Sequence, residues 1–348
     1  MKKFGKLLLG LLTGTMLLAG VTGCGSKETN NSSETTEKSS GATEEKVDVK
    51  ISYWDYNIQG SLLVYSKELG LLEKEFPKDG NVTVSLIPFE NGPTANEAIT
   101  AGELDFELSI GDQPFITGNA NGVNTSILAT TMKQEKTYIT VVAKDSDINS
   151  YADLKGKNIA VGIGTFTHKS LIGLLKDNGI SETEVSFTNI GDSGYAEALT
   201  AISRGELDAY FGSWANLTSA IENGSVKKIG DSTGHPLSTY FVGTNSFIEK
   251  HPEVTEKLVK VLDETVAYIN EKPEEAIDYF AKQLDWSKET VASLIENVDL
   301  VIDFTAQDEV SVKETQDFLL SQDILDEEVE ALIEKHTNPS FVKKVKGK

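Results

Sequence analysis

Two segments of the chain repeat one pattern: EAITAGELDF at residues 97–106 and EALTAISRGELDAY at residues 197–210. In each segment a run of helix-forming residues is followed by a glycine, Gly102 or Gly205, which suits the left-handed cap at which helices end. The next residues have the character of a strand beginning. Equivalent helix-to-strand units predict two similar α/β lobes, and the three extra residues of the second copy add nearly one helical turn. Chance is the alternative, because Gly-Glu-Leu-Asp consists of common residues.

Strand-like and helix-like patterns alternate on both sides of these units. Residues 49–53 and 82–86 alternate with period two, and residues 138–143 and 159–162 are short apolar runs. Glycine or proline commonly stands at the junctions between the patterns. The sequence therefore predicts an α/β fold with mainly parallel sheets.

The pattern becomes helical after His251-Pro252. Pro252 suits the first turn of a helix, and Pro273 suits the start of another. No segment between there and Lys348 is read as a strand, so the C-terminal part is predicted to be helical. The residues expected to share the buried face of the first of these helices are Val254, Leu258, Val261 and Leu262.

The N-terminus has the features of a lipoprotein signal. Three lysines precede an apolar run at residues 7–21, and the run closes on Val-Thr-Gly-Cys at 21–24. The run is too short, and too interrupted by Gly and Thr, for a membrane span of about 20 residues. Residues 1–23 are therefore predicted to be a cleaved signal peptide, and Cys24 to carry a lipid that holds the protein at the cell membrane. The alternative is that Cys24 is a spare buried cysteine.

Composition limits the remaining possibilities. Residues 25–46 contain one weakly apolar residue, Ala42, so residues 24–46 are predicted to be a disordered tether. Cys24 is the single cysteine, so with a lipid on it no cysteine remains for a disulfide, a nucleophile or a zinc-thiolate site. The chain has 32 basic and 54 acidic residues, a net charge of −22, so nucleic acid is not an expected partner. Arg204 is the only arginine, which excludes an anion clamp made of several arginines.

A series of short motifs carries a resemblance to a known family. They are GSL at 60–62, FENGP at 89–93, EA at 97–98 with AGELDF at 101–106, GDQP at 111–114, DLKGK at 153–157, GT at 164–165 with His168, and GELDA at 205–209. Between about residues 49 and 253 the chain resembles the substrate-binding lipoproteins of ABC importers in the nitrate, sulfonate and taurine group, most closely the aliphatic sulfonate-binding branch.

The resemblance implies a two-lobed periplasmic-binding-protein-like fold (type II), in which two hinge strands join the lobes and the ligand binds in the cleft. Lobe one is expected at 47–143 and 240–348, and lobe two at 144–239. It further implies a monomer anchored by its lipid on the extracytoplasmic face, which delivers a small solute to an ABC permease in the cytoplasmic membrane. No chemistry of its own, no cofactor and no metal are expected.

Glycine-marked turns suggest how the ligand is held. In open parallel sheets ligands bind beyond the carboxyl ends of the strands, where helix N-termini present unpaired N–H groups. Such ends can hold a sulfonate or taurine without an arginine cluster. The residues expected to bind the ligand are Asn57, Gln59, Ser61, Gly92, Thr94, Asp112, Gln113, Thr165, His168, Asp192 and Trp214.

Several of these residues also fit a structural role. Thr94 with Glu97 matches a capping box, so its hydroxyl is also suited to cap its own helix. His168 is also interpretable as a bystander, and Trp214 as a core residue. Asn57 and Gln59 also suit a solvent-exposed turn.

Asp112 and Asp192 argue against a purely anionic ligand, because a carboxylate beside an anion costs energy. If both face inward, an amino-sulfonate or an uncharged heterocycle fits better. Gln113 replaces the small residue that the family pattern implies, which leaves the ligand open. The alternative function is therefore a binder of a thiamine-type pyrimidine precursor, favoured if Trp54, Tyr56 and Trp214 line the cleft. Thiamine-pyrimidine synthases share the implied fold but use a cysteine-rich motif that this chain lacks.

Overall fold

The computed structural model describes residues 45–55, 57–89, 92–191 and 194–347, and Glu45–Lys348 is one compact unit. The predicted signal peptide, Cys24 and the tether up to residue 44 lie outside the described residues, as do Tyr56 and Asp192. Among the described residues, no helix combines the length and the apolar character needed to cross a membrane.

The first sheet has six strands in the order β11-β4-β10-β3-β1-β2. Strands β2, β1 and β3 are parallel, whereas β10, β4 and β11 pair antiparallel. The bounds are β1 Val47–Tyr53, β2 Val82–Pro88, β3 Phe106–Gly111, β4 Thr125–Gln134, β10 Leu237–Thr244 and β11 Asp299–Asp303.

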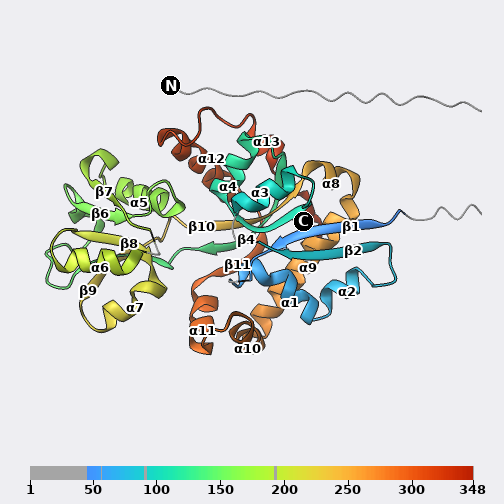
Figure 1. Ribbon diagram of the computed structural model, residues 1–348, viewed down its shortest axis with the longest axis horizontal. Coiled ribbons are helices and arrows are strands. Elements are labelled where there is room, and N and C mark those ends of the chain that lie inside the picture. Colours follow the sequence, from blue (N-terminus) through green and yellow to red (C-terminus); the bar gives the residue numbers. More distant parts are fainter. Residues whose placement is uncertain (1–44, 56, 90–91, 192–193, 348) are drawn as a thin grey trace, which may run out of the picture. The chain divides into compact units, whose positions relative to one another are not determined.

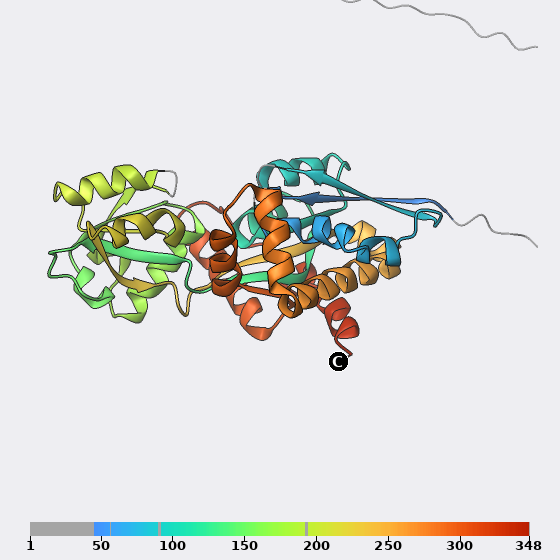
Figure 2. The same ribbon diagram turned by 90° about the horizontal axis from the view of Figure 1, so that it is seen from below.

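The second sheet has five strands in the order β7-β6-β8-β5-β9 and follows the same plan. Strands β7, β6 and β8 are parallel, and β5 pairs antiparallel with β8 and β9. The bounds are β5 Tyr138–Ala143, β6 Asn158–Val161, β7 Ser186–Asn189, β8 Ala209–Ser213 and β9 Val226–Asp231. Figure 1 shows β6 to β9 grouped apart from the labelled strands of the first sheet, and Figure 2 shows the same grouping from below. The fold is thus two-lobed α/β, as predicted, with mixed rather than mainly parallel sheets.

Helices connect the strands in both lobes. In lobe one they are η1 Gln59–Ser61, α1 Leu62–Glu68, α2 Leu71–Glu75, α3 Gly92–Thr100, α4 Asp112–Ala120, α8 Asn245–Lys250, α9 Pro252–Glu271, α10 Pro273–Leu284, α11 Lys288–Asn297, α12 Ala306–Ser321, α13 Leu332–His336 and α14 Ser340–Val345. In lobe two they are η2 Tyr151–Leu154, α5 Phe166–Asp177, η3 Glu182–Glu184, α6 Tyr195–Ser203 and α7 Trp214–Glu222.

The repeated sequence makes the same connection in each lobe. Helices α3 and α6 are followed by Gly102 and Gly205, whose φ angles of 73° and 72° are left-handed. The Asp105 carboxylate then accepts from Lys50 N in β1 at 2.9 Å, and the Asp208 carboxylate accepts from Asn158 N in β6 at 2.9 Å. Each aspartate therefore ties the beginning of its own strand to the middle one of the three parallel strands in its sheet. The prediction of equivalent units is confirmed.

The chain crosses between the sheets twice, at residues 135–137 and 232–236. The predicted boundary put residues 138–143 in lobe one, but these residues form β5 and pair with β8 and β9 of the second sheet. The predicted return to lobe one at residue 240 was also wrong, because residues 237–239 in β10 already pair with β4 of the first sheet. Lobe one therefore comprises residues 45–134 and 237–347, and lobe two comprises residues 138–231.

The C-terminal part is helical except for one strand. Helix α9 begins at Pro252 and buries Val254, Leu258, Val261 and Leu262, and α10 begins at Pro273, as predicted. The expectation of no further strand was wrong, because β11 pairs antiparallel with β4 at the edge of the first sheet. Its Leu300 and Ile302 are buried, while Asp299 at its start is exposed.

Glu107 is an unusual core residue. It lies on β3 with 0% exposure, and neither carboxyl oxygen has a hydrogen-bond partner among the described residues. In the neighbouring strand β1 it pairs with Ser52, which is also fully buried. Burial raises the pKa of the Glu107 carboxyl well above its ordinary range, because a charged carboxylate is poorly solvated there. The folded state therefore binds a proton that the unfolded chain releases.

We expect Gly102→Ala and Gly205→Ala to lower the free energy of unfolding by about 1–2 kcal/mol each, because both positions are left-handed. Urea denaturation measures the effect, with Ala101→Ser at an exposed neighbouring position as the control. No atom outside the adjoining residues lies within 4 Å of the added Cβ in either case, so backbone strain alone is tested. Unchanged stability in both variants would contradict this account.

We expect Glu107 to contribute stability that is fully present below about pH 4.3, the unfolded pKa of glutamate, and that declines as pH rises above it. The slope is about 1.4 kcal/mol per pH unit until the raised folded pKa is passed, because only the folded state holds the proton in that window. Glu107→Gln should remove this contribution, while Glu103→Gln at an exposed site should keep it. Urea denaturation between pH 4 and 8 measures the difference; parallel curves for wild type and Glu107→Gln would refute it.

Candidate functional site

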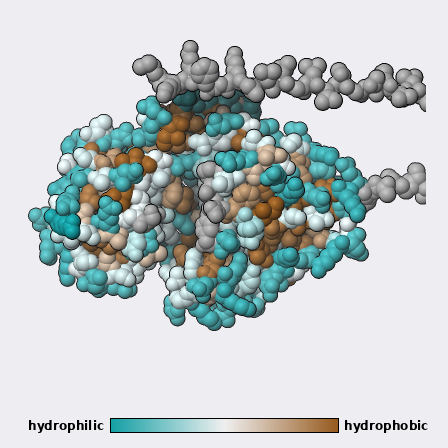
Figure 3. All heavy atoms as spheres, in the orientation of Figure 1, coloured by the Kyte–Doolittle hydropathy of each residue, from teal (hydrophilic) through white to brown (hydrophobic). Residues whose placement is uncertain are grey.

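The predicted ligand residues lie at the carboxyl ends of parallel strands. In lobe one these ends lead from β1 into η1, from β2 toward α3 and from β3 into α4. In lobe two they lead from β6 into α5 and from β8 into α7. Figure 3 shows the surface hollowed between the two lobes. The candidate site consists of these loops and the helix N-termini that follow them.

The turn after β1 is held together internally. The Asn57 side-chain oxygen accepts from Gly60 N at 2.7 Å. Ser61 is fully buried, and its hydroxyl donates to Trp54 O at 2.8 Å and accepts from Gln283 at 3.3 Å. A Cβ on Gly60 would lie 2.4 Å from Trp54, so glycine is required there. Asn57 and Ser61 therefore shape this turn, and Gln59 is the half-buried residue of η1 beside them.

The start of α3 differs from the predicted capping box. The helix begins by Gly92, so Thr94 lies inside its first turn rather than at the N-cap. A Cβ on Gly92 would lie 2.9 Å from Pro114 and 3.6 Å from a Glu107 carboxyl oxygen. Gly92 therefore brings α3 close to α4, and the exposed Thr94 lies on the surface of that turn.

The N-terminus of α4 is not an open anion site, although Gly111 to Pro114 was expected to provide one. Asp112 is the first helical residue, and its carboxylate accepts from Gln113 N at 2.9 Å. Pro114 has no N–H group to offer. This helix end is therefore occupied by its own carboxylate.

Asp112 pairs with a cation from the other lobe. Its side chain is 3% exposed and accepts from Lys169 Nζ of α5 at 2.8 Å. The Thr315 hydroxyl of α12 also donates to this carboxylate and accepts from Lys169 Nζ at 2.6 Å. The Asp112 carboxylate therefore faces a cation, and the protein itself supplies that cation.

The N-terminus of α5 is open. Its N-cap residue Thr165 makes no side-chain cap, because the hydroxyl donates to Gly162 O at 2.6 Å. Gly164 has a left-handed φ of 77°, and its carbonyl accepts from Gln113 Nε2 at 2.9 Å. The first N–H groups of this 12-residue helix thus begin at an exposed threonine beside the other lobe.

His168 is a buried residue rather than a ring aimed into open space. It is 3% exposed, and its Nδ1 accepts from Gly164 N at 3.3 Å. The ring packs edge-on against Phe187 in lobe two and Phe318 in α12, with centroids 4.7 and 5.5 Å away. Burial lowers the pKa of His168 below its ordinary value of 6.5, which keeps the ring neutral. His168 therefore supports the Gly164 loop from behind.

Trp214 begins α7 and is 36% exposed, so the core interpretation was wrong. Its backbone N–H donates to Thr137 O in the first crossing at 2.8 Å, and the Lys228 ammonium lies 6.0 Å from its ring centroid. Trp54, in contrast, is 3% exposed and packs against α3. Of these two tryptophans, only Trp214 offers an exposed aromatic face.

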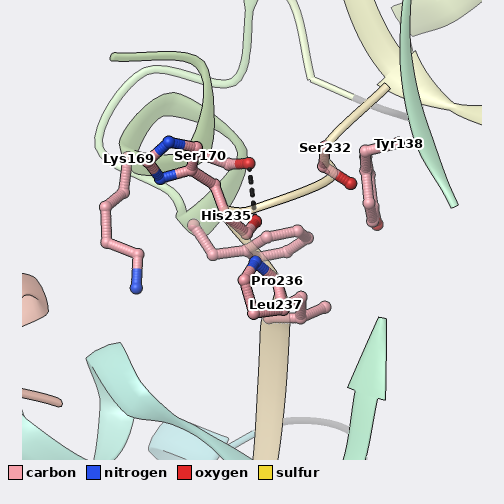
Figure 4. Close-up of a pocket in the computed structure, with 8 residues that line it drawn as sticks. Tyr138, Lys169, Ser170, Ser232, His235, Pro236 and Leu237 are labelled. Atoms are coloured by element: carbon pink, nitrogen blue, oxygen red, sulfur yellow. Dashed lines mark hydrogen bonds between the residues drawn. The ribbon is translucent and has the colours of Figure 1, made fainter. Parts of the chain in front are cut away.

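Helix α5 also holds the second crossing. The Ser170 hydroxyl donates to His235 O at 3.0 Å, and His235 Nε2 lies 2.8 Å from the Asp177 carboxylate. A Cβ on Gly173 would lie 2.3 Å from the His235 ring, so this glycine allows the contact. Figure 4 shows the Ser170–His235 hydrogen bond among the residues that line a cavity of about 10 Å³, the space of one water molecule.

A larger cavity of about 390 Å³ lies between α5, the second crossing and α12. Lys169 and His235 line it, together with Phe318 and the acidic Glu314. Lys169 lines this cavity but no residue of the candidate-site loops does, so the cavity is distinct from the candidate site. Among the described residues no group of three or more His, Cys, Asp or Glu side chains is placed to hold a metal ion.

Sequence reasoning missed Lys169, Thr315 and Phe318. Lys169 directly follows the motif histidine, but its partner Asp112 is 57 residues away and Thr315 is 203 residues from Asp112. The contacts between the lobes join α4 and α12 of lobe one to α5 and the Gly164 loop of lobe two, and Gln322 also donates to Glu182 in η3 at 3.5 Å.

We expect His168→Gln to remove a pH dependence of stability. The folded pKa of His168 is lowered, so its stabilisation is present above pH 6.5 and is lost as pH falls below it, when the unfolded histidine takes up a proton. Gln keeps an acceptor for Gly164 N and does not titrate. Denaturation at pH 5 and 7.5 measures the change, with the partly exposed His251→Gln as the control. A wild-type slope that persists in His168→Gln would contradict the assignment.

Comparisons with known proteins fit this geometry. A putative aliphatic sulfonates-binding protein of Bacillus subtilis (strain 168) is 26% identical over 292 residues, which cover 82% of this chain and 86% of the relative. The taurine-binding periplasmic protein of Escherichia coli (strain K12) is 28% identical over 202 residues, covering 57% of this chain and 61% of that protein.

The crystal structure of the periplasmic aliphatic sulphonate binding protein SsuA from Escherichia coli has the same fold. It matches with a TM-score of 0.69 and 24% identity over 81% of this chain and 90% of that chain. The NMT1/THI5-like family profile matches residues 72–276, more than half of the chain. The chain therefore belongs to the NMT1/THI5-like family.

Proposed function

We propose that this protein is the extracytoplasmic solute-binding component of an ABC importer. It binds a small anionic solute, such as an aliphatic sulfonate or taurine, and delivers it to a permease in the cytoplasmic membrane without chemistry of its own. The names of the Bacillus subtilis and Escherichia coli relatives support this class of ligand. The proposal includes a signal peptide at residues 1–23, a lipid on Cys24 and a monomeric protein held at the cell membrane.

The observation that carries the proposal is the open N-terminus of α5. A sulfonate has acceptor oxygens only, and it stays ionised at physiological pH. Thr165 leaves the first helical N–H groups of α5 without a side-chain cap, and Gly164 allows the left-handed turn that precedes it. A helix N-terminus stabilises a nearby anion by about 0.3–1 kcal/mol when it is exposed and by more when it is partly buried. Enclosure of the anion by both lobes therefore strengthens binding.

The proposed ligand residues follow from the geometry. Thr165 and the α5 N-terminus hold the anionic group, and Gln113 closes the site from lobe one through its bond to Gly164. Gln59, Gly92 and Thr94 face the ligand from the other turns of lobe one, and Trp214 borders its apolar part. Asn57, Ser61 and His168 shape the turns.

The second proposed function is a binder of a pyrimidine precursor or another small heterocycle. The exposed ring of Trp214 favours it, because a heterocycle stacks on an aromatic face. The burial of Trp54 removes one of the three aromatic residues on which this alternative relied.

A thermal-shift screen of residues 45–348 tests the proposal, with ethanesulfonate, taurine, nitrate and thiamine-type pyrimidines as ligands. A ligand at 100 times its dissociation constant stabilises the protein by about 2.7 kcal/mol. Shifts with the sulfonates support the proposal. A shift with pyrimidines alone supports the alternative, and turnover of any compound would indicate an enzyme.

We expect Thr165→Trp to abolish the sulfonate-induced shift, because an indole covers the first N–H groups of α5. The ligand-free protein should stay folded, since Thr165 is exposed. Thr183→Trp, at an exposed site in η3 of the same lobe, is the matched control and should bind normally. An undiminished shift in Thr165→Trp would exclude this helix end from the site.

A further inference from the structure

The contact between the lobes contains a buried charge pair beside the candidate site. Asp112 of lobe one and Lys169 of lobe two are 3% and 17% exposed, and their charged atoms are 2.8 Å apart. Thr315 of α12 bonds to both groups. Charges this buried are costly unless they are paired, so each lobe brings a charge that the other neutralises.

The pair also adjoins the proposed anion site. Gln113, the residue after Asp112, donates to Gly164 O, and Gly164 immediately precedes the N-cap of α5. Lys169 lies in the second turn of the same helix, four residues after Thr165. An anion at the α5 N-terminus is therefore close to the Asp112 carboxylate, which repels it unless Lys169 is in place.

We propose that Lys169 is a positioning residue that makes anion binding depend on contact between the lobes. When the lobes are in contact, Lys169 neutralises Asp112, and the α5 N-terminus accepts an anion. When they separate, Asp112 keeps its bonds from Gln113 N and Thr315, which belong to its own lobe, but no cation neutralises its charge. The anion then binds the contacting state more tightly than the separated state, and this difference in affinity is what drives closure. The inference rests on the proposed function, because it concerns an anionic ligand.

Three variants distinguish this role from that of a clasp, meaning an ion pair that only holds the lobes together. Lys169→Met leaves the buried Asp112 charge unpaired and should weaken ethanesulfonate binding by about 10- to 100-fold. Asp112→Asn removes the repelling charge and should bind at least as tightly as wild type. The double variant carries neither charge and should lie within about fivefold of wild type. Lys176→Met, at an exposed lysine of the same helix, is the control and should change nothing.

Calorimetric titration of each purified variant with ethanesulfonate and with taurine measures these affinities. A clasp that only holds the lobes together predicts equal losses in all three variants, and that result would overturn the inference. So would wild-type affinity in Lys169→Met. If Lys169→Met does not fold, the affinity of Asp112→Asn relative to wild type distinguishes the two roles. A clasp predicts that Asp112→Asn binds the sulfonates more weakly than wild type, and that result would overturn the inference.

The two proposals fail in different ways. If the wild-type chain binds neither sulfonate, the proposed function and this inference fall together. If the wild-type chain binds and the variants do not follow the expected order, only the role of Lys169 is lost.

Discussion

The structure depends on one constraint, the parallel order of the three strands that form one side of each sheet. Parallel strands need a crossover connection, and helices make it here after β1, β2, β6 and β7. The carboxyl ends of β3, β1 and β2 therefore all open at one edge, and those of β8, β6 and β7 at one edge of the second sheet. Loops that are far apart in the sequence are gathered by this arrangement alone. The antiparallel strand β10 follows β3 in the first sheet, and β5 follows β8 in the second. The chain enters these two strands directly after crossing from the other lobe.

The contact between the lobes pairs one negative charge, Asp112, with one positive charge, Lys169. The chain is strongly acidic and has a single arginine, so a solute with a negative charge meets an unfavourable overall field. Backbone N–H groups provide local positive potential without adding a basic side chain. One lysine in the right place then has a large effect, because the carboxylate that it neutralises is nearly inaccessible to water. An exposed pair of the same two residue types would stabilise the contact between the lobes only slightly, because water screens its charges.

Local sequence determined more of the fold than of the site. Gly102 and Gly205 were predictable because their backbone geometry needs glycine, and the apolar face of α9 because its spacing is helical. The lobe assignment of residues 138–143 was not, since an apolar run does not specify its partner strands. Strand β11 was missed because Leu300-Val301-Ile302 is too short to distinguish from a helix edge.

In the candidate site, too, one part was predictable from local sequence and another was not. The loops at Gly92, Gly111 and Gly164 were found because turns have a local chemistry. The roles of their side chains were not, because they depend on distant partners: Gln283 for Ser61, Lys169 for Asp112, and Phe318 for His168. These contacts also explain why a residue within a family motif need not touch a ligand.

Helix α5 has three tasks, at three points along its length. Its first turn faces the candidate site, Lys169 meets lobe one, and Gly173 with Asp177 receives His235 of the second crossing. A 12-residue helix is a rigid rod of about 18 Å, so its two ends cannot move independently. The second crossing between the lobes and the candidate site are thus joined by one rigid helix, and a tilt of its C-terminal end also displaces its N-terminal turn.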